Sequence, residues 1–267
     1  MSQQGSPREP TDRLAPWAGQ GLAGFVQRAR REALDAARLL DVAHVIEGKP
    51  GVYVSGDAGR FVRRIDVAGR SVLVTVTRPS GRAPRALETA HHHVALRAVG
   101  LGALEPWLAL EGVHDRERVG VLMTSAPPGP TLEAWLAAGP SRAARRERAD
   151  DVGRALRALH TARFTLPRVT AWTVALAPRP GWRHVVFVDL ASLRRLGRRL
   201  SLRAVARDLA ALDVSLGDLV SDRERLRALR AWLGGTLDRA RPWLRRLERV
   251  RRQLAGKPWL QRPTVAS

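Results

Sequence analysis

The 267-residue sequence carries 46 basic and 25 acidic residues, a formal net charge of +21, with 45% hydrophobic and 27% charged residues. This composition is typical of a soluble globular protein, and no apolar run reaches the roughly 18–20 residues of a membrane-spanning helix. The chain has no cysteine, which excludes disulfides and thiolate metal sites and favours a cytoplasmic location. The charge favours an anionic partner, such as nucleic acid, a membrane surface or a phosphorylated sugar. Arginine, alanine and leucine dominate throughout, so part of the charge is compositional bias.

The N-terminal half is predicted to form a small antiparallel sheet with one helix. Residues 1–20 are polar and rich in Pro and Gly, which predicts a disordered tail without a secretory signal. Apolar residues at helical spacing from Leu22 to Leu40 predict one amphipathic helix within residues 21–50. Five strands and a helix follow in residues 51–124, because glycine turns separate β-branched runs. The strands are expected at 51–55, 60–67, 71–77, 107–110 and 119–123, and the helix at 85–99.

The C-terminal half is predicted to be mainly helical. "SAPPGP" (125–130) reads as a Pro/Gly hinge. Residues 131–238 show helical spacing except for a short hairpin at 174–176 and 185–188. Residues 239–267 are predicted to form a very basic helix and tail. The predicted class is therefore α+β with two lobes.

Four segments carry a more specific signal through their order and spacing. "VLMTSAPPGPTLEAWL" (121–136) is similar to the last strand, the hinge and the next helix of a protein kinase. "RALRALHTARF" (154–164) resembles the helix before the catalytic loop, and "VVFVDL" (185–190) the strand before the metal-binding aspartate. "VARDLAALDVSL" (205–216) resembles a helix of the lipopolysaccharide kinases. From about residue 51 to residue 233 the chain thus resembles that family, which implies a two-lobed protein-kinase-like fold.

The resemblance implies ATP- and Mg²⁺-dependent phosphoryl transfer to Kdo or heptose of the lipopolysaccharide core. Such chemistry needs a cation on the α- and β-phosphates, and the family's lysine falls at Thr75. No lysine occurs between residues 49 and 257. Glu88 is the candidate for the acid that pairs this lysine, and without it Glu88 is expected to be an exposed acid at a helix start. Arg78 or Arg63 is an alternative cation.

A glycine-rich turn lies where a phosphate-covering loop is expected. Gly56 and Gly59 flank it and would let backbone amides approach phosphate. Asp57 in its middle would repel phosphate. We therefore favour an ordinary hairpin turn.

The catalytic loop is expected in "FTLPRVTAWT" (164–173), where the base position falls at Arg168 or Val169. Residues 152–188 contain no Asp or Glu, and the whole chain contains no Asn. Asp189 is left as the candidate metal ligand. Its structural interpretation, a strand-end carboxylate bonded to backbone amides or to Arg194 or Arg195, is favoured.

Three further features leave alternatives open. Asp208 resembles a helix acid that braces the catalytic loop, but a surface pairing acid is nearly as well supported. Residues 91–93 are three consecutive histidines, which cannot converge on one ion because successive helix positions point about 100° apart; a plain helix surface is expected. The basic helix at 239–252 either lies on an anionic membrane or packs on the helical lobe with a solvated Arg face.

The sequence therefore predicts a degenerate lipopolysaccharide-kinase-type protein that binds a protein partner or an anionic glycolipid. Binding of ATP and Mg²⁺ is expected to be weak or lost. An active kinase of core sugars is the alternative, and a nucleic-acid-binding protein, supported by charge alone, is the third. The resemblance implies a peripheral location at the inner face of the cytoplasmic membrane.

Overall fold

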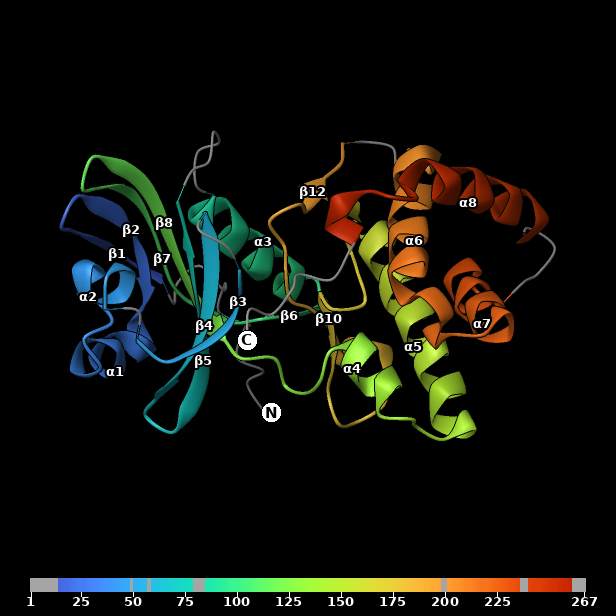
Figure 1. Ribbon diagram of the computed structural model, residues 1–267, viewed down its shortest axis with the longest axis horizontal. Helices are drawn as coiled ribbons and strands as arrows, with labels where there is room; N and C mark the ends of the chain where they lie inside the picture. Colours follow the sequence, from blue (N-terminus) through green and yellow to red (C-terminus); the bar gives the residue numbers. More distant parts are fainter. Residues whose placement is uncertain are drawn as a thin grey trace, which may run out of the picture. The chain divides into compact units, whose positions relative to one another are not determined.

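The computed structural model describes residues 14–48, 50–56, 59–78, 85–197, 201–235 and 240–260 (Figure 1). It confirms an α+β protein with a large antiparallel sheet. The chain divides into two compact units. The described residues of the first unit fall within 14–98 and 105–126, and those of the second within 99–104 and 127–260.

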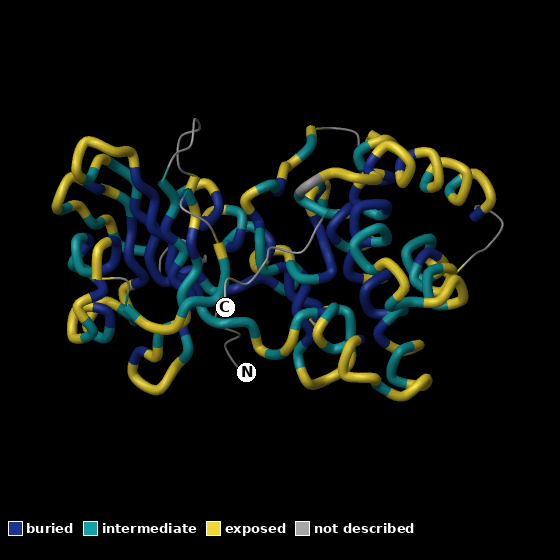
Figure 2. Tube along the Cα trace, viewed as in Figure 1, coloured by how far each residue is buried: buried dark blue, intermediate teal, exposed yellow. Residues whose placement is uncertain are grey.

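The first unit is built on a seven-stranded antiparallel sheet with the order β1-β2-β7-β8-β5-β4-β3. Its central strands carry most of the buried residues (Figure 2). The predicted strands at 51–55, 60–67 and 71–77 are confirmed, while the two later strands are longer than expected. The strands are β1 (Leu14–Gly19), β2 (Leu22–Gln27), β3 (Val52–Gly56), β4 (Arg60–Val67), β5 (Arg70–Thr77), β7 (Pro106–His114) and β8 (Glu117–Ser125).

The prediction of a small sheet preceded by one helix from Leu22 to Leu40 is wrong. Residues 14–19 and 22–27 form the hairpin β1–β2, and β2 pairs with β7. The turn is Gln20–Gly21, where both residues have positive φ, 52° and 80°, as a two-residue hairpin turn requires. Of the predicted tail, residues 1–13 lie outside the described part of the chain.

Helices cover both faces of this sheet. The short helices α1 (Arg31–Ala36) and α2 (Val42–Ile46) bury Leu34, Val45 and Ile46 in the larger apolar cluster. The predicted helix at 85–99 is confirmed as α3 (Ala86–Ala98), which packs against β7 and β8 through a second cluster. Gly100, just after it, has a φ of +76°, the left-handed conformation of a helix C-cap.

The second unit is mainly helical. Its helices are α4 (Leu132–Ala137), α5 (Arg142–Thr161), α6 (Leu202–Leu216), α7 (Asp222–Leu233) and α8 (Ala240–Leu254). The predicted hairpin is confirmed as β10 (Val174–Leu176) and β11 (Val185–Phe187), with β6 (Gly102–Ala103) added in parallel. A second small sheet pairs β9 (Phe164–Thr165) with β12 (Arg194–Arg195). In the described residues, no helix has the length and apolar character to cross a bilayer.

Candidate functional site

The loop after α5 is the centre of the candidate site. Its start is fixed by β9, which pairs with β12, and it then turns sharply, because the Val169 amide donates to the Leu166 carbonyl at 2.9 Å. The turn puts the Arg168 side chain in solvent and buries Val169 completely, with 0% of its surface exposed. Of the two residues at the predicted base position, one is therefore a solvated cation and the other a core side chain.

Asp208 on α6 holds this loop from beneath. The residue is fully buried, with 0% exposure, and its Oδ2 accepts a hydrogen bond from the Leu166 amide at 2.7 Å. The same oxygen lies 3.2 Å from His160 Nε2 at the end of α5. Asp208 therefore braces the loop, and the alternative of a surface pairing acid is wrong.

The hydrogen-bond chain also fixes the tautomer of His160. Trp232 Nε1 on α7, which has only a proton to donate, lies 2.9 Å from His160 Nδ1. His160 Nδ1 is therefore the acceptor, and Nε2 carries the proton that is donated to Asp208. Burial raises the pKa of Asp208, while the bonds from His160 and Leu166 act in the opposite direction. The network joins α5, α6 and α7 to the loop.

The rest of the loop is held by the Thr173 side chain and by Ser215 of α6. The Ala171 amide donates to Ser215 Oγ at 2.8 Å, and Ser215 Oγ donates to the Leu212 carbonyl. The Thr170 amide donates to Thr173 Oγ1 at 2.9 Å. The loop is thus tied at both ends and in the middle, as a positioning loop needs to be.

Asp189 lies two residues after β11, close to the end of this loop. The Val188 amide donates to the Thr173 carbonyl at 2.8 Å, which joins the two segments. The half-buried Asp189 carboxylate accepts from the Ala191 amide at 3.1 Å. This bond is the backbone interaction expected of a strand-end carboxylate.

The other predicted site residues belong to the first unit. Thr75 lies in β5, opposite Val62 and Leu122. Glu88, in the first turn of α3, has a half-exposed side chain that pairs with Arg85 at 3.3 Å, as expected of an acid at a helix start.

The predicted phosphate loop is the connection of the β3–β4 hairpin. Gly56 has a φ of +133°, and a Cβ there would lie 2.1 Å from the Arg60 carbonyl oxygen, so glycine is needed for hairpin geometry alone. The Arg78 amide donates to the Gly59 carbonyl at 2.7 Å. Asp57 lies outside the described residues.

The three histidines of α3 do not form one site. His93 is buried, with 1% exposure, so the expectation of a plain helix surface is wrong for this residue. His91 packs on the Phe25 ring, and His92 Nε2 lies 4.0 Å from Glu88. Their different partners agree with the prediction that they cannot share an ion.

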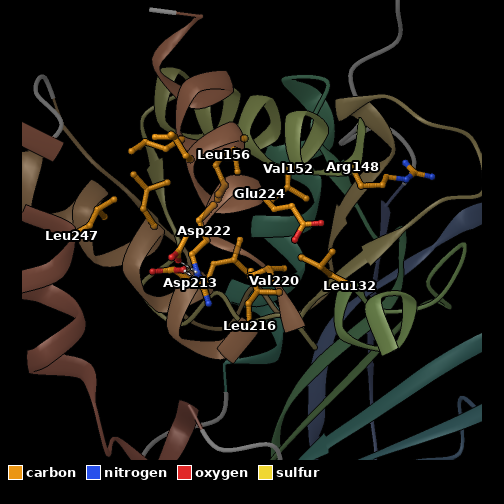
Figure 3. Close-up of a pocket in the computed structure, with 18 of the residues that line it drawn as sticks. Leu132, Arg148, Val152, Leu156, Asp213, Leu216, Val220, Asp222, Glu224 and Leu247 are labelled. Carbon is orange, nitrogen blue, oxygen red and sulfur yellow. Dashed lines mark hydrogen bonds and ion pairs between the residues drawn. The ribbon is translucent and has the colours of Figure 1, made fainter. Parts of the chain in front are cut away.

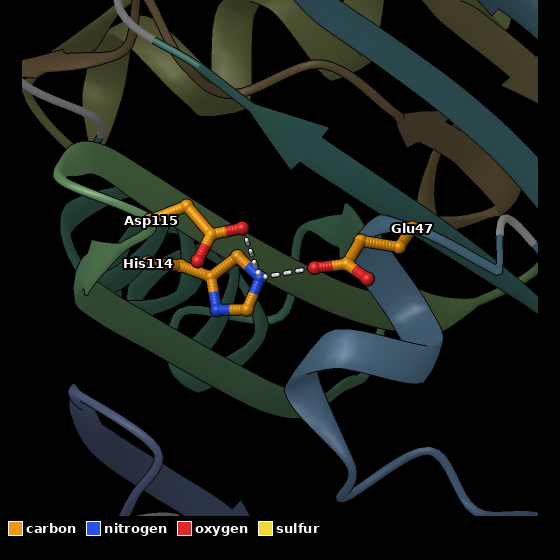
Figure 4. A group of neighbouring side chains, drawn as sticks. All are labelled: Glu47, His114 and Asp115. Carbon is orange, nitrogen blue, oxygen red and sulfur yellow. Dashed lines mark hydrogen bonds and ion pairs between the residues drawn. The ribbon is translucent and has the colours of Figure 1, made fainter.

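A different histidine does meet carboxylates. His114 Nε2, at the end of β7, lies 2.9 Å from Glu47 Oε1 and 3.6 Å from Asp115 Oδ2 (Figure 4). Within the described residues this is the group that could offer three ligands to a metal. Both carboxylates are largely exposed, and the contacts also fit simple ion pairing between α2 and the β7–β8 hairpin.

The second unit also contains an apolar pocket of about 510 Å³ that is partly open to solvent and that the sequence pattern did not predict (Figure 3). Leucines from α5, α6, α7 and α8 line it, with Leu132 and Leu136 of α4. Charged pairs stand at its border: Arg145 with Glu224, and Asp213 with Arg225 and Arg251. The apolar stripes of these helices were visible in the sequence. A stripe predicts that a helix packs against its neighbours, but it does not predict whether the side chains fill the space between the helices.

No protein-family model matches this sequence, and no curated protein is similar to it.

Proposed function

We propose that this chain is a kinase-like protein of the lipopolysaccharide-kinase type that has lost phosphoryl transfer and binds an anionic glycolipid of the cell envelope. One observation carries the proposal: the loop is braced by a buried aspartate, yet it presents no base. Asp208 holds the Leu166 amide at 2.7 Å, while the two candidate base positions are an exposed arginine and a fully buried valine. Arginine stays protonated in proteins and cannot accept the substrate proton.

The residues present do not fit a magnesium-bound triphosphate. Mg²⁺ prefers several oxygen ligands in octahedral geometry, and the chain offers Asp189 without the asparagine of the kinase pattern. The alternative cation Arg63 is already used, because its Nε donates to the Pro50 carbonyl at 3.0 Å. We therefore expect ATP·Mg²⁺ to bind weakly or not at all.

The binding role is supported by α8 and by the apolar pocket. Helix α8 carries six arginines and one glutamate, and its Arg side chains are exposed. Its residues Trp243 and Leu247 face the second unit, where Trp243 packs on Trp232 with 4.7 Å between ring centroids. The helix thus packs on the unit and keeps a cationic outer face. Beneath it, the pocket offers apolar surface for the hydrocarbon part of an amphiphile.

The test combines phosphoryl transfer with ligand binding. Radiolabelled ATP and a lipopolysaccharide-core acceptor are incubated with the protein, and ATP·Mg²⁺ binding is measured by titration calorimetry. We expect no transfer and no micromolar binding. Transfer that disappears in Asp189→Ala would refute the proposal and establish the alternative, an active sugar kinase with Arg78 in place of the lysine.

Membrane binding is tested separately with vesicles containing anionic phospholipid. Each arginine near such a surface contributes about 1 kcal/mol, and salt screens this attraction. Binding should therefore weaken steeply with salt and fall when residues 239–267 are deleted. Equal binding by the truncated protein would remove α8 from the proposal. Tighter binding to a defined nucleic acid than to vesicles would favour the third hypothesis.

A further inference from the structure

Helices α5 and α7 pack against each other (Figure 1). An arginine-rich hollow lies at the start of both helices. Its volume is about 520 Å³. Apart from arginine, its lining includes Ser221, Leu226 and one acid, Glu224. The six arginines are Arg142, Arg145, Arg146, Arg223, Arg227 and Arg230.

The single acid in the hollow is already neutralised. Arg145 binds Glu224 with two hydrogen bonds, from Nε to Oε1 at 2.6 Å and from Nη2 to Oε2 at 3.0 Å. Glu224 also accepts from the Ser221 amide at 2.7 Å, which completes the capping box of α7. This pair therefore forms a rigid wall of the hollow and leaves no negative charge for the other arginines.

The remaining arginines are largely without a counter-charge. Arg227 pairs with Asp150 at 2.6 Å. For Arg142, Arg146 and Arg223, the described part of the chain offers no carboxylate within 4.0 Å, and all three side chains are exposed. Three guanidinium groups with free donors thus border one hollow.

The position of these charges on α5 is also unfavourable for the helix itself. Ser141 caps α5, and the first turn contains no acid, while Arg142, Arg145 and Arg146 lie within its first five residues. The N-terminus of a helix carries the positive end of its dipole, so cations there are destabilising and anions are stabilising. An anion in the hollow would reverse this effect and would also meet the guanidinium groups.

We propose that this hollow is a binding site for a compact anion that carries several phosphate groups. Guanidinium groups bind phosphate oxygens in bidentate geometry, and several of them are needed to match more than one phosphate. The same chemistry is offered by free polyphosphate and by a phosphorylated lipid headgroup. The lining contains no aromatic ring on which a base could stack, which favours a compact anion over single-stranded nucleic acid. The site does not depend on the proposed function.

The experiment measures binding of tripolyphosphate to the full-length protein by titration calorimetry. The site variant is Arg142→Gln/Arg146→Gln/Arg223→Gln. The matched control, Arg64→Gln/Arg70→Gln/Arg118→Gln, removes the same charge from exposed positions of the first unit. We expect the site variant to bind at least about tenfold more weakly, because it loses several charge-assisted hydrogen bonds, and the control to stay within about twofold. Equal losses in both variants, or no loss in the site variant, would overturn the proposal.

Melting temperatures separate a lost site from a lost fold. Without tripolyphosphate, the site variant should melt at or above the temperature of the native protein, since it relieves repulsion at the start of α5. With tripolyphosphate, only the native protein and the control should gain stability. Vesicles with and without phosphatidic acid then distinguish the sources: selective loss of vesicle binding in the site variant assigns a lipid headgroup, and unchanged vesicle binding assigns a soluble polyphosphate. Tighter binding of an oligonucleotide through the same arginines would refute the compact-anion site.

Discussion

Replacing Asp208 tests the central feature of the candidate site, the brace beneath the loop. Asp208→Ala leaves two buried donors, the Leu166 amide and His160 Nε2, without an acceptor. Each unsatisfied buried donor costs about 1–3 kcal/mol, so we expect a loss of about 4 kcal/mol in the free energy of unfolding. Asp208→Asn keeps an acceptor oxygen of the same shape and should cost much less, about 1 kcal/mol.

The measurement is urea denaturation followed by tryptophan fluorescence, with Asp218→Ala as the control. Asp218 is exposed in the 3-10 turn that follows α6, and its removal should change stability by less than about 0.5 kcal/mol. Native-state hydrogen exchange supplies a local readout, because the Leu166 amide should lose protection in Asp208→Ala. A stability loss below about 1 kcal/mol, or unchanged protection of the Leu166 amide, would show that Asp208 does not brace the loop.

The pH dependence of the same variants tests the charge state. Burial raises the pKa of Asp208 above its ordinary value of 3.8, so the folded protein keeps the proton at pH values where the unfolded chain has lost it. The resulting stability is fully present below pH 3.8 and is lost as the pH rises through the folded-state pKa. Asp208→Asn has no proton to lose. The native protein should therefore lose stability relative to this variant as the pH rises from about 4 to about 7. The opposite slope would contradict a raised pKa of Asp208.

Three further predictions concern single side chains. The bonds from Arg145 lower the pKa of Glu224 to about 2. Because solvent screens this pair, Glu224→Gln should cost about 2 kcal/mol at neutral pH, less than the full shift would give. This cost should disappear as the pH falls from 4.5 through about 2, as urea titrations at both ends of the range would measure. Asp189→Ala should lower stability by about 1 kcal/mol, through the lost backbone bond, without changing phosphoryl transfer. Val169→Asp should lower stability by about 3 kcal/mol, because it buries an unpaired carboxylate, whereas Arg168→Asp at an exposed position should leave the melting temperature nearly unchanged.

Local signals in the sequence predicted part of this fold. They failed where pairing between distant strands determined the secondary structure. The strands β3, β4 and β5 and the helix α3 could be predicted because glycine turns separate them. The helix expected from Leu22 failed because Leu22, Phe25 and Val26 fit a helical spacing, yet as β2 these residues pair with β7, about 85 residues later in sequence. The turn Gln20–Gly21 was the available signal.

The candidate site was predictable in its residue types and not in its contacts. The sequence shows directly that residues 152–188 contain no Asp or Glu, so the loop contains no acidic residue. The role of Asp208 could not be decided, since its bond to Leu166 joins residues 42 positions apart. The arginine hollow was missed for the same reason: "SRAARRER" was visible at the start of α5, but only folding brings Arg223 of α7 to it.

The hydrogen bonds that hold the loop do not depend on a general base or a metal ligand of a phosphoryl transfer. Asp208 binds a backbone amide and His160, Ser215 binds the Ala171 amide, and Trp232 binds His160. Backbone amides are present whatever side chains the loop carries, so the loop does not need a carboxylate at Val169 to keep its conformation. That valine adds to the core, where a carboxylate would cost stability. A loop stabilised in this way keeps its conformation without a carboxylate at this position, which supports the binding role proposed for this chain.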